Sequence, residues 1–187
     1  MDMKQNRILI VVDMQKDFID GALGTPEAVA IVDPVAGKIR EAQANGDMVL
    51  FTRDTHLENY RETEEGKNLP VPHCIKGTAG WQISEKLTGR DVDHCFDKYT
   101  FGSLEMGHFL KTMSQEAVSW RIELVGLCTD ICVLSNAVIA KAALPNAHIV
   151  VDAACCAGVT PASHDTALNA MKAIQVEVLN QGKENWR

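Results

Sequence analysis

Residues 7–13 read RILIVVD, a nearly continuous apolar run that ends in a carboxylate. Runs rich in β-branched residues are typical of strands that are buried on both faces of a parallel sheet. Outward from this run, strand-like segments alternate with segments of helical period. We expect further strands at 47–52, 92–99, 121–128, 147–152 and 174–179, and helices at 26–45, 103–113, 130–144 and 163–173.

This alternation predicts an α/β fold, a three-layer α/β/α sandwich around a mostly parallel sheet of about six strands, of the Rossmann-like type. Gly46 is expected to end the first helix and Ser103 to cap the second. Residues 55–80 break the rhythm, because they have no clear period and contain several Pro and Gly residues. Irregular segments of this length in a compact domain are usually functional or disordered.

The composition limits the classes of partner. The 187 residues include 18 Lys and Arg against 25 Asp and Glu, a formal net charge of −7. This balance argues against nucleic acid, because phosphate binding needs a basic surface. The length fits a single domain, residues 1–187. The early apolar run, residues 8–12, is too short for a membrane span of about 20 residues or for a signal peptide. We therefore expect a cytoplasmic protein without membrane or nucleic-acid partners.

The cysteines have no Cys-x-x-Cys spacing, and without a secretion signal a disulfide framework is not expected. Most of them should be reduced and packed as small apolar side chains. Cys132 is the candidate exception. If Thr129 caps the helix at 130–144, Cys132 lies in its first turn, where backbone N–H groups and the helix dipole lower the pKa of a thiol. Cys132 is then a candidate nucleophile, with core packing as the alternative.

Other reactive side chains stand where the predicted strands end. Parallel α/β sheets bind ligands beyond the carboxyl ends of their strands. Asp13 ends the first strand and is a candidate base for a thiol, while Lys98 ends the third and would balance negative charge. The alternatives are a carboxylate that caps a turn and a solvated surface lysine.

A set of possible metal ligands follows the second strand. Asp54 and His56 are two residues apart, and His73 follows the irregular segment. Oxygen and nitrogen donors of this kind suit zinc, iron or manganese, and Glu64 or Glu65 would add another oxygen. The alternative is that these are unrelated loop residues. We interpret the remaining histidines as structural: His94, His108, His148 and His164.

Three motifs occur in order along the chain: DMQKDF at 13–18, DKYTFG at 97–102 and GLCTDICV at 126–133. Together they resemble the isochorismatase-like cysteine hydrolases, and within that family the nicotinamidases, over nearly the whole chain. The resemblance implies a catalytic triad of Asp13, Lys98 and Cys132. It also implies a non-proline cis peptide bond before Cys128, with the backbone N–H groups of Cys128 and Cys132 facing an oxyanion.

The likeness to nicotinamidases depends on the segments FTRDTH at 51–56 and PHCIKGTAG at 72–80. They supply Asp54, His56 and His73 as metal ligands by resemblance. A subgroup of these enzymes adds a glutamate, for which we prefer Glu65 over Glu64. The resemblance implies one divalent metal ion, with zinc preferred over iron or manganese.

The family's substrate pocket has an aromatic wall, which Phe18 resembles. Leu69 stands in the stretch where the family has a second aromatic wall, and we add Phe101 to the predicted lining. The resemblance implies hydrolysis of nicotinamide to nicotinate and ammonia through a thioester on Cys132, in a protein that can form homo-oligomers.

Other functions stay open at this stage. Within the family, the substrate is alternatively another small amide or isochorismate. A cysteine redox protein would use Cys128 and Cys132, although the spacing is not Cys-x-x-Cys. A flavodoxin-like binding module would need a Gly-rich phosphate loop after the first strand, and only Gly21 and Gly24 stand there.

Overall fold

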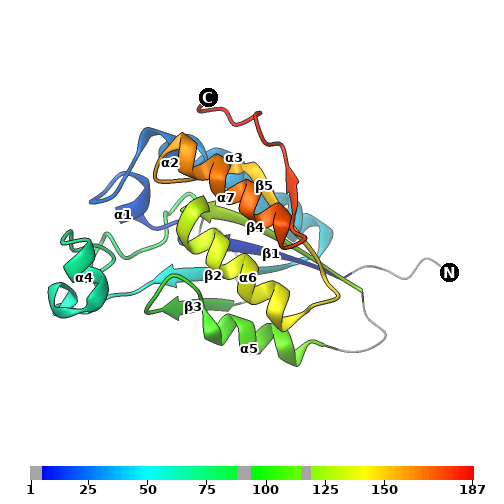
Figure 1. The fold of residues 1–187 in the computed structure, drawn as a ribbon, viewed down its shortest axis with the longest axis horizontal. Helices are drawn as coiled ribbons and strands as arrows, with labels where there is room; N and C mark the ends of the chain where they lie inside the picture. The colour runs from blue at the N-terminus through cyan, green and yellow to red at the C-terminus, as the bar shows by residue number, and fades with distance from the viewer. Residues whose placement is uncertain (1–5, 88–93, 115–118) are drawn as a thin grey trace.

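The computed structural model describes residues 6–87, 94–114 and 119–187, and in these residues it forms one six-stranded sheet. The strands are β1 (Asn6–Val12), β2 (Met48–Asp54), β3 (His94–Lys98), β4 (Trp120–Leu127), β5 (His148–Ala157) and β6 (Glu177–Leu179). Their order is β3-β2-β1-β4-β5-β6, and every neighbouring pair is parallel. All carboxyl ends therefore face the same edge of the sheet, and those of β1–β4 point to the left in Figure 1.

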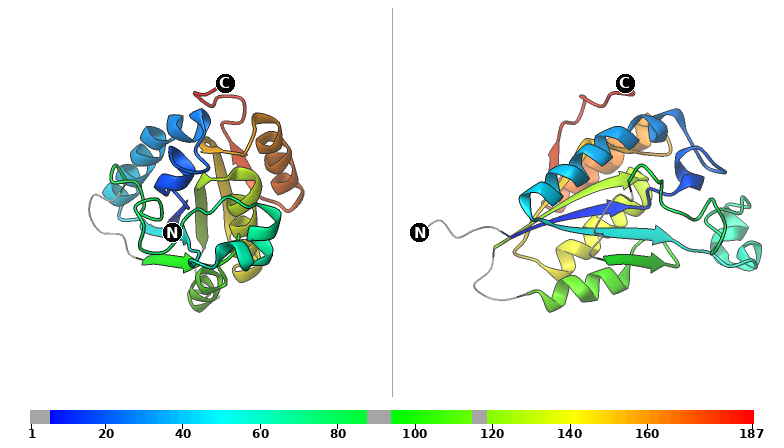
Figure 2. Two further views of the ribbon diagram at one scale, coloured as in Figure 1. Left: turned by 90° about the vertical axis from the view of Figure 1, so that its left-hand side faces the viewer. Right: turned by 180° about the vertical axis from the view of Figure 1, so that it is seen from behind.

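Helices cover both faces of the sheet, as the left view of Figure 2 shows. One face carries α1 (Lys16–Ile19), α2 (Pro26–Ala30) and α3 (Val32–Asn45), and the other carries α5 (Leu104–Thr112), α6 (Leu134–Ala143) and α7 (Pro161–Ala173). Successive side chains of a strand point to opposite faces. Accordingly Ile8, Ile10 and Val12 join the core under α5–α7, while Leu9 and Val11 join the core under α1–α3. The predicted three-layer sandwich is confirmed.

Two of the predicted helix ends are confirmed. Gly46 ends α3 with a left-handed φ of 73°, and its N–H donates to the carbonyl oxygens of Ala42 and Gln43. The Ser103 side chain caps α5 by accepting the N–H of Met106 at 3.1 Å. In the part of the chain that the structure describes, no helix combines the length and the apolar character that a membrane span requires.

The predicted start of the last helix at Ser163 is wrong, because α7 begins two residues earlier, at Pro161. Thr160 is its cap and accepts the N–H of Ser163 at 3.1 Å, while the Ser163 hydroxyl accepts the N–H of Thr160 at 3.1 Å. Ser163 is therefore the third residue of the helix, inside a reciprocal capping box.

The single helix predicted for residues 26–45 is divided into α2 and α3 at Ile31. Pro34 explains the break. It has no N–H to donate to the carbonyl of Ala30, and its ring crowds that carbonyl. The freed Ala30 oxygen accepts instead from the side-chain amide of Asn185, at 2.9 Å.

The helix predicted for residues 130–144 begins with a π-helical turn, η2 (Thr129–Val133), which continues into α6. The prediction that Thr129 caps this helix is wrong. Cys128 occupies the cap position, and the Thr129 hydroxyl lies 2.7 Å from His164 Nδ1 instead. The irregular segment after β2 contains the 3-10 turn η1 (Tyr60–Glu62) and the short helix α4 (Glu64–Asn68), which lie beyond the carboxyl ends of the strands (Figure 1).

Gly126 brings β4 close to β1. Its φ is +118°, and a Cβ placed on it would lie 2.1 Å from the carbonyl oxygen of Val12. We expect Gly126→Ala to lower the free energy of unfolding by about 2 kcal/mol or more, measured by urea denaturation. Gly37→Ala is the control, because a Cβ at this α3 position meets only the end of Arg40 at 3.9 Å. An unchanged urea midpoint for Gly126→Ala would contradict this account.

Candidate active site

The structure brings Asp13, Lys98 and Cys132 together at the carboxyl edge of the sheet. Asp13 follows β1, Lys98 ends β3, and Cys132 lies in η2 directly after β4. Lys98 Nζ is 2.6 Å from Asp13 Oδ2 and 3.5 Å from Cys132 Sγ. None of the three is more than 6% exposed. Lys98 is therefore a buried ion-pair partner, and the alternative of a solvated surface lysine is wrong.

Asp13 is held in place by its backbone and by a hydroxyl. Its φ of 46° turns the chain at the end of β1, and the Thr52 hydroxyl donates to its Oδ1 at 2.7 Å. Burial raises the pKa of the Asp13 carboxyl, and the nearby Asp54 charge adds to this effect while Lys98 opposes it. A carboxylate with a raised pKa is a stronger base.

Burial also raises the pKa of the Cys132 thiol well above its usual value, with a further contribution from Asp13 and an opposing one from Lys98. The predicted lowering of this pKa by a helix N-terminus is therefore wrong in direction, because desolvation of the thiolate outweighs it. The Cys132 thiol therefore needs a base beside it. Asp13 is placed for that role, because its carboxylate contacts the same Lys98 amine that lies next to the Cys132 sulfur. Burial raises the pKa of the Cys128 thiol to about 12, which disfavours Cys128 as a redox partner.

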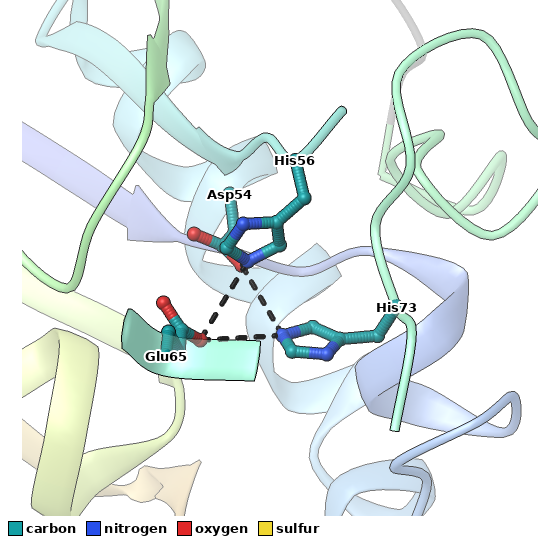
Figure 3. A group of neighbouring side chains, drawn as sticks. All are labelled: Asp54, His56, Glu65 and His73. Carbon is teal, nitrogen blue, oxygen red and sulfur yellow. Dashed lines mark ion pairs between the residues drawn. The ribbon is translucent and has the colours of Figure 1, made fainter. Parts of the chain in front are cut away.

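A second cluster lies beside these residues, and Figure 3 shows its side chains converging on one point. The cluster comprises Asp54 at the end of β2, His56 just after it, Glu65 in α4, and His73. One ligand atom from each lies within 4.8 Å of the others. His56 Nε2 is 2.9 Å from Asp54 Oδ2 and 3.6 Å from Glu65 Oε1, and His73 Nε2 is 3.7 Å from the same glutamate oxygen.

The donor set of this cluster fits a divalent metal ion. His73 Nδ1 lies 2.8 Å from the carbonyl oxygen of Val71, which orients its Nε2 toward the cluster. Two carboxylates converge there, and burial together with the Asp54 charge raises the pKa of Glu65, so a cation would relieve their repulsion. Two imidazoles and two carboxylates suit zinc, iron or manganese. Glu64 is exposed, and its Oε1 lies 3.4 Å from the Asn68 amide outside the cluster.

Asp54 belongs to both groups of residues. Its Oδ2 faces the histidines, and its Oδ1 accepts a hydrogen bond from Lys98 Nζ at 3.0 Å. Burial opposes ionisation of Asp54, yet hydrogen bonds from His56 and His73 and the Lys98 charge outweigh it and hold the carboxyl pKa well below its usual range. The candidate metal ligands and the candidate triad therefore share one carboxylate.

Two positioning residues of the site were missed by the sequence analysis. The Gln15 amide clamps the backbone of Asp54, donating to its carbonyl oxygen at 2.8 Å and accepting its N–H at 2.7 Å. Asp17 Oδ2 accepts the N–H of Cys74 at 2.8 Å, beside His73. Both lie in DMQKDF, between the quoted Asp13 and Phe18, so the motif itself was the available signal.

A cavity of about 300 Å³ opens beside Cys132. The three predicted lining residues, Phe18, Leu69 and Phe101, all border it, and so does Cys128. The Leu127–Cys128 peptide bond is cis, as the resemblance implied. The remaining walls are the candidate metal ligands Asp54, Glu65 and His73, together with Leu23, Thr25, Ala28, Leu127, Ile131, Gly158 and Val159. Such a cavity suits a small, largely apolar molecule.

Comparisons with known proteins agree with these observations. A protein described as an uncharacterized isochorismatase family protein, PncA of Bacillus subtilis, is 32% identical over 141 residues, 71% of this chain and 76% of that protein. The nicotinamidase/pyrazinamidase of Mycobacterium tuberculosis is 27% identical over 186 residues, covering 92% of this chain and 98% of its own. The structure of the pyrazinamidase of Pyrococcus horikoshii, determined with zinc, superimposes with a TM-score of 0.80 at 26% identity, covering 93% of this chain and 98% of that one.

The model of the isochorismatase domain matches residues 7–182, which is nearly all of the sequence. The match includes all three motifs quoted above, and the fold agrees with that of the solved relatives. The chain therefore belongs to the isochorismatase domain family and is a hydrolase of that family.

Proposed function

We propose that this protein hydrolyses nicotinamide to nicotinate and ammonia, as a cysteine amidohydrolase that binds one divalent metal ion. The observation that carries the proposal is the shared position of Asp54, which joins the Asp13–Lys98–Cys132 group to the His56–His73 cluster at one small cavity. Relatives named nicotinamidase, and a pyrazinamidase solved with zinc, support the substrate class and zinc as the metal.

The first half of the reaction forms the thioester. The Asp13 carboxylate takes the proton of the Cys132 thiol, and the sulfur attacks the carbonyl carbon of the amide. Backbone N–H groups of Cys128 and Cys132 stabilise the oxyanion. As the C–N bond breaks, Asp13 returns its proton to the departing nitrogen, and ammonia leaves. Lys98 is ion-paired with Asp13 and lies 3.5 Å from Cys132 Sγ. Its positive charge therefore offsets the negative charge that the Asp13 carboxylate and the Cys132 sulfur share.

The second half of the reaction releases the acid. Asp13 takes a proton from a water molecule, whose oxygen attacks the thioester carbonyl. As the C–S bond breaks, Asp13 gives that proton to the leaving sulfur, which restores the Cys132 thiol and the Asp13 carboxylate. Asp54, His56, Glu65 and His73 would hold the metal ion, which supplies a Lewis acid that orients the ring nitrogen of the substrate. Phe18 lines the cavity and packs against His73, with ring centroids 5.4 Å apart.

The direct test is ammonia release from nicotinamide by purified protein reconstituted with zinc, and in parallel with iron or manganese. We expect turnover with at least one of these ions and its loss after chelation. Absence of turnover with every ion would reject nicotinamide as the substrate.

The metal cluster makes a paired prediction at Glu64 and Glu65. Glu65→Gln removes one charged ligand and should weaken zinc binding by about 10- to 100-fold, measured by competition with a chromophoric chelator. Glu64→Gln is the matched control, since the Glu64 side chain is exposed and lies outside the cluster. Equal zinc affinities for the two variants would remove Glu65 from the ligand set.

A different neutral amide is the second candidate substrate. Leu69, Ile131 and Val159 give the cavity aliphatic walls that do not require a flat ring. No Lys or Arg is among the described residues that line it, which disfavours isochorismate because that molecule carries two carboxylates. A panel of aliphatic and aromatic carboxamides, ranked by kcat/KM, separates these substrates.

A further inference from the structure

A chain of buried polar side chains connects the nucleophile turn η2 to the C-terminal segment, residues 182–187. Thr129, the first residue of η2, places its hydroxyl 2.7 Å from His164 Nδ1 on α7. His164 Nε2 lies 3.2 Å from Glu184 Oε1. Thr129 and His164 have no exposed surface, and Glu184 is 4% exposed. None of the three lines the cavity, and their side-chain hydrogen bonds run to one another and to the C-terminal segment rather than to the candidate triad.

The far end of this chain is fixed by the C-terminal segment. The Glu184 carboxylate pairs with the Arg187 guanidinium, which also reaches Asp165 Oδ1 at 2.6 Å, and it accepts the N–H of Gly182 at 3.1 Å. The Trp186 ring packs edge-on against the His164 ring, with centroids 5.1 Å apart. His164 is therefore enclosed by this segment.

The contacts assign the protons of His164. A neutral imidazole with its proton on Nε2 donates to the Glu184 carboxylate and accepts the Thr129 hydroxyl proton on Nδ1. Burial lowers the pKa of His164 and favours this neutral form. Although His164, Asp165 and Glu184 lie close enough to hold a metal ion, the Arg187 guanidinium already pairs with both carboxylates. The group is thus a hydrogen-bond network.

A second contact holds the same turn. Asp130, the residue after Thr129, accepts the N–H of Val159 on its Oδ1 at 3.1 Å, and Val159 lines the cavity. Cys132 follows two residues later in the turn, and its sulfur must meet Lys98 at one side and the substrate at the other. Small displacements of a reacting atom cause large losses of rate.

We propose that Thr129, His164 and Glu184 form a positioning chain that holds η2, so that residues 182–187 set the reactivity of Cys132. The proposal rests on the proposed role of Cys132 as the nucleophile. It assigns His164, otherwise a buried structural histidine, an effect on catalysis through Thr129. Because these residues do not border the cavity, their loss should lower kcat much more than it raises KM.

The sharpest test compares Thr129→Val with Thr129→Ser. Valine keeps the shape of threonine but removes the hydroxyl, whereas serine keeps the hydroxyl and removes a methyl group. If the hydroxyl positions the turn, Thr129→Val loses function and Thr129→Ser retains it. If Thr129 only fills space, serine is the more damaging change. Ile149→Val is the control for loss of one buried methylene group. Ile149 lies near the amino end of β5, away from the edge of the sheet that carries the site.

Thiol reactivity gives a readout that does not depend on the substrate. The zinc-loaded protein is treated with iodoacetamide, and alkylation of each cysteine peptide is followed by mass spectrometry. Cys95 is exposed and serves as the internal reference. We expect Thr129→Val to slow alkylation of Cys132 relative to Cys95 by roughly tenfold, with Thr129→Ser and Ile149→Val within about twofold of the parent protein.

Equal Cys132 alkylation in Thr129→Val and the parent protein, or an equal loss in Thr129→Ser, overturns the proposal. His164→Phe keeps a ring against Trp186 and removes both nitrogens, so it should slow Cys132 as Thr129→Val does, and it carries the test if the valine variant does not fold. On nicotinamide, kcat should fall about tenfold or more with KM within about threefold. A parent protein that is inactive on nicotinamide rejects the proposed function, while the alkylation comparison still decides the positioning chain.

Discussion

The Cys132→Ala protein is expected to fold, to bind zinc and to release ammonia from nicotinamide at least about 10⁴-fold more slowly than the parent protein. The reason is that the proposed reaction passes through a covalent bond to Cys132 Sγ, which borders the cavity and lies 3.5 Å from Lys98 Nζ. Ammonia release gives the rate. Intact-mass analysis of rapidly quenched parent protein should show the acyl group on Cys132.

Cys155→Ala is the matched control for this variant. Cys155 is also buried, at 4% exposed, but it lies on β5 and does not line the cavity. Its rate should stay within a fewfold of the parent value. If Cys132→Ala kept a tenth of the activity or more, the thioester mechanism would be wrong, although membership of the family would stand.

Lys98→Met is expected to lose both activity and stability. Lys98 Nζ lies between two buried carboxylates, 2.6 Å from Asp13 Oδ2 and 3.0 Å from Asp54 Oδ1. Removing the ammonium leaves two negative charges buried together, and breaking a buried ion pair typically costs about 3–5 kcal/mol. Urea denaturation of the metal-free protein measures this loss, and activity should fall with it because the partner of Asp13 is gone.

The double variant Asp13→Asn with Lys98→Met separates the two effects. It removes one of the uncompensated charges, so part of the stability should return while activity does not. Lys76→Met is the control, because Lys76 is 48% exposed and its ion pair with Asp97, at 3.6 Å, should contribute less than about 1 kcal/mol. A Lys98→Met protein as stable as Lys76→Met would show that the buried carboxylates are protonated without the lysine.

The candidate triad was predictable because strand ends in a parallel sheet share one edge. Asp13, Lys98 and Cys132 each follow or end a strand, and the sheet order makes their strands neighbours or near neighbours. The direction of the Cys132 pKa was not predictable. A helix start can be read locally, but the desolvation that raises this pKa comes from elements distant in the sequence.

The choice between Glu64 and Glu65 depends on where a short helix begins. Thr63 caps α4 by accepting the N–H of Gly66 at 3.0 Å, which makes Glu65 the second helical residue and turns it toward the histidines. A five-residue helix has too little period to be located from apolar spacing. The ambiguity in the sequence analysis was therefore one of helical phase.

Charge pairs between distant parts of the sequence account for two other differences between the predictions and the structure. The strand predicted at 147–152 was ended at a carboxylate, yet β5 continues to Ala157 because Asp152 is buried in an ion pair with Lys38 of α3, at 2.9 Å. His164 looked structural because its partner Glu184 lies beyond β6. No local pattern reports such pairs, since each partner comes from a separate element.

The sheet order has a consequence for the chain during synthesis. Of the six strands described, β1 comes first along the chain and lies inside the sheet, with β2 on one edge and β4 on the other. After β2 has paired, the other edge of β1 keeps unpaired backbone N–H and C=O groups until Leu127 has left the ribosome. Unpaired strand edges of this kind are templates for aggregation. The nascent protein is therefore most vulnerable between the completion of β2 and β4, when shielding by a chaperone would matter most.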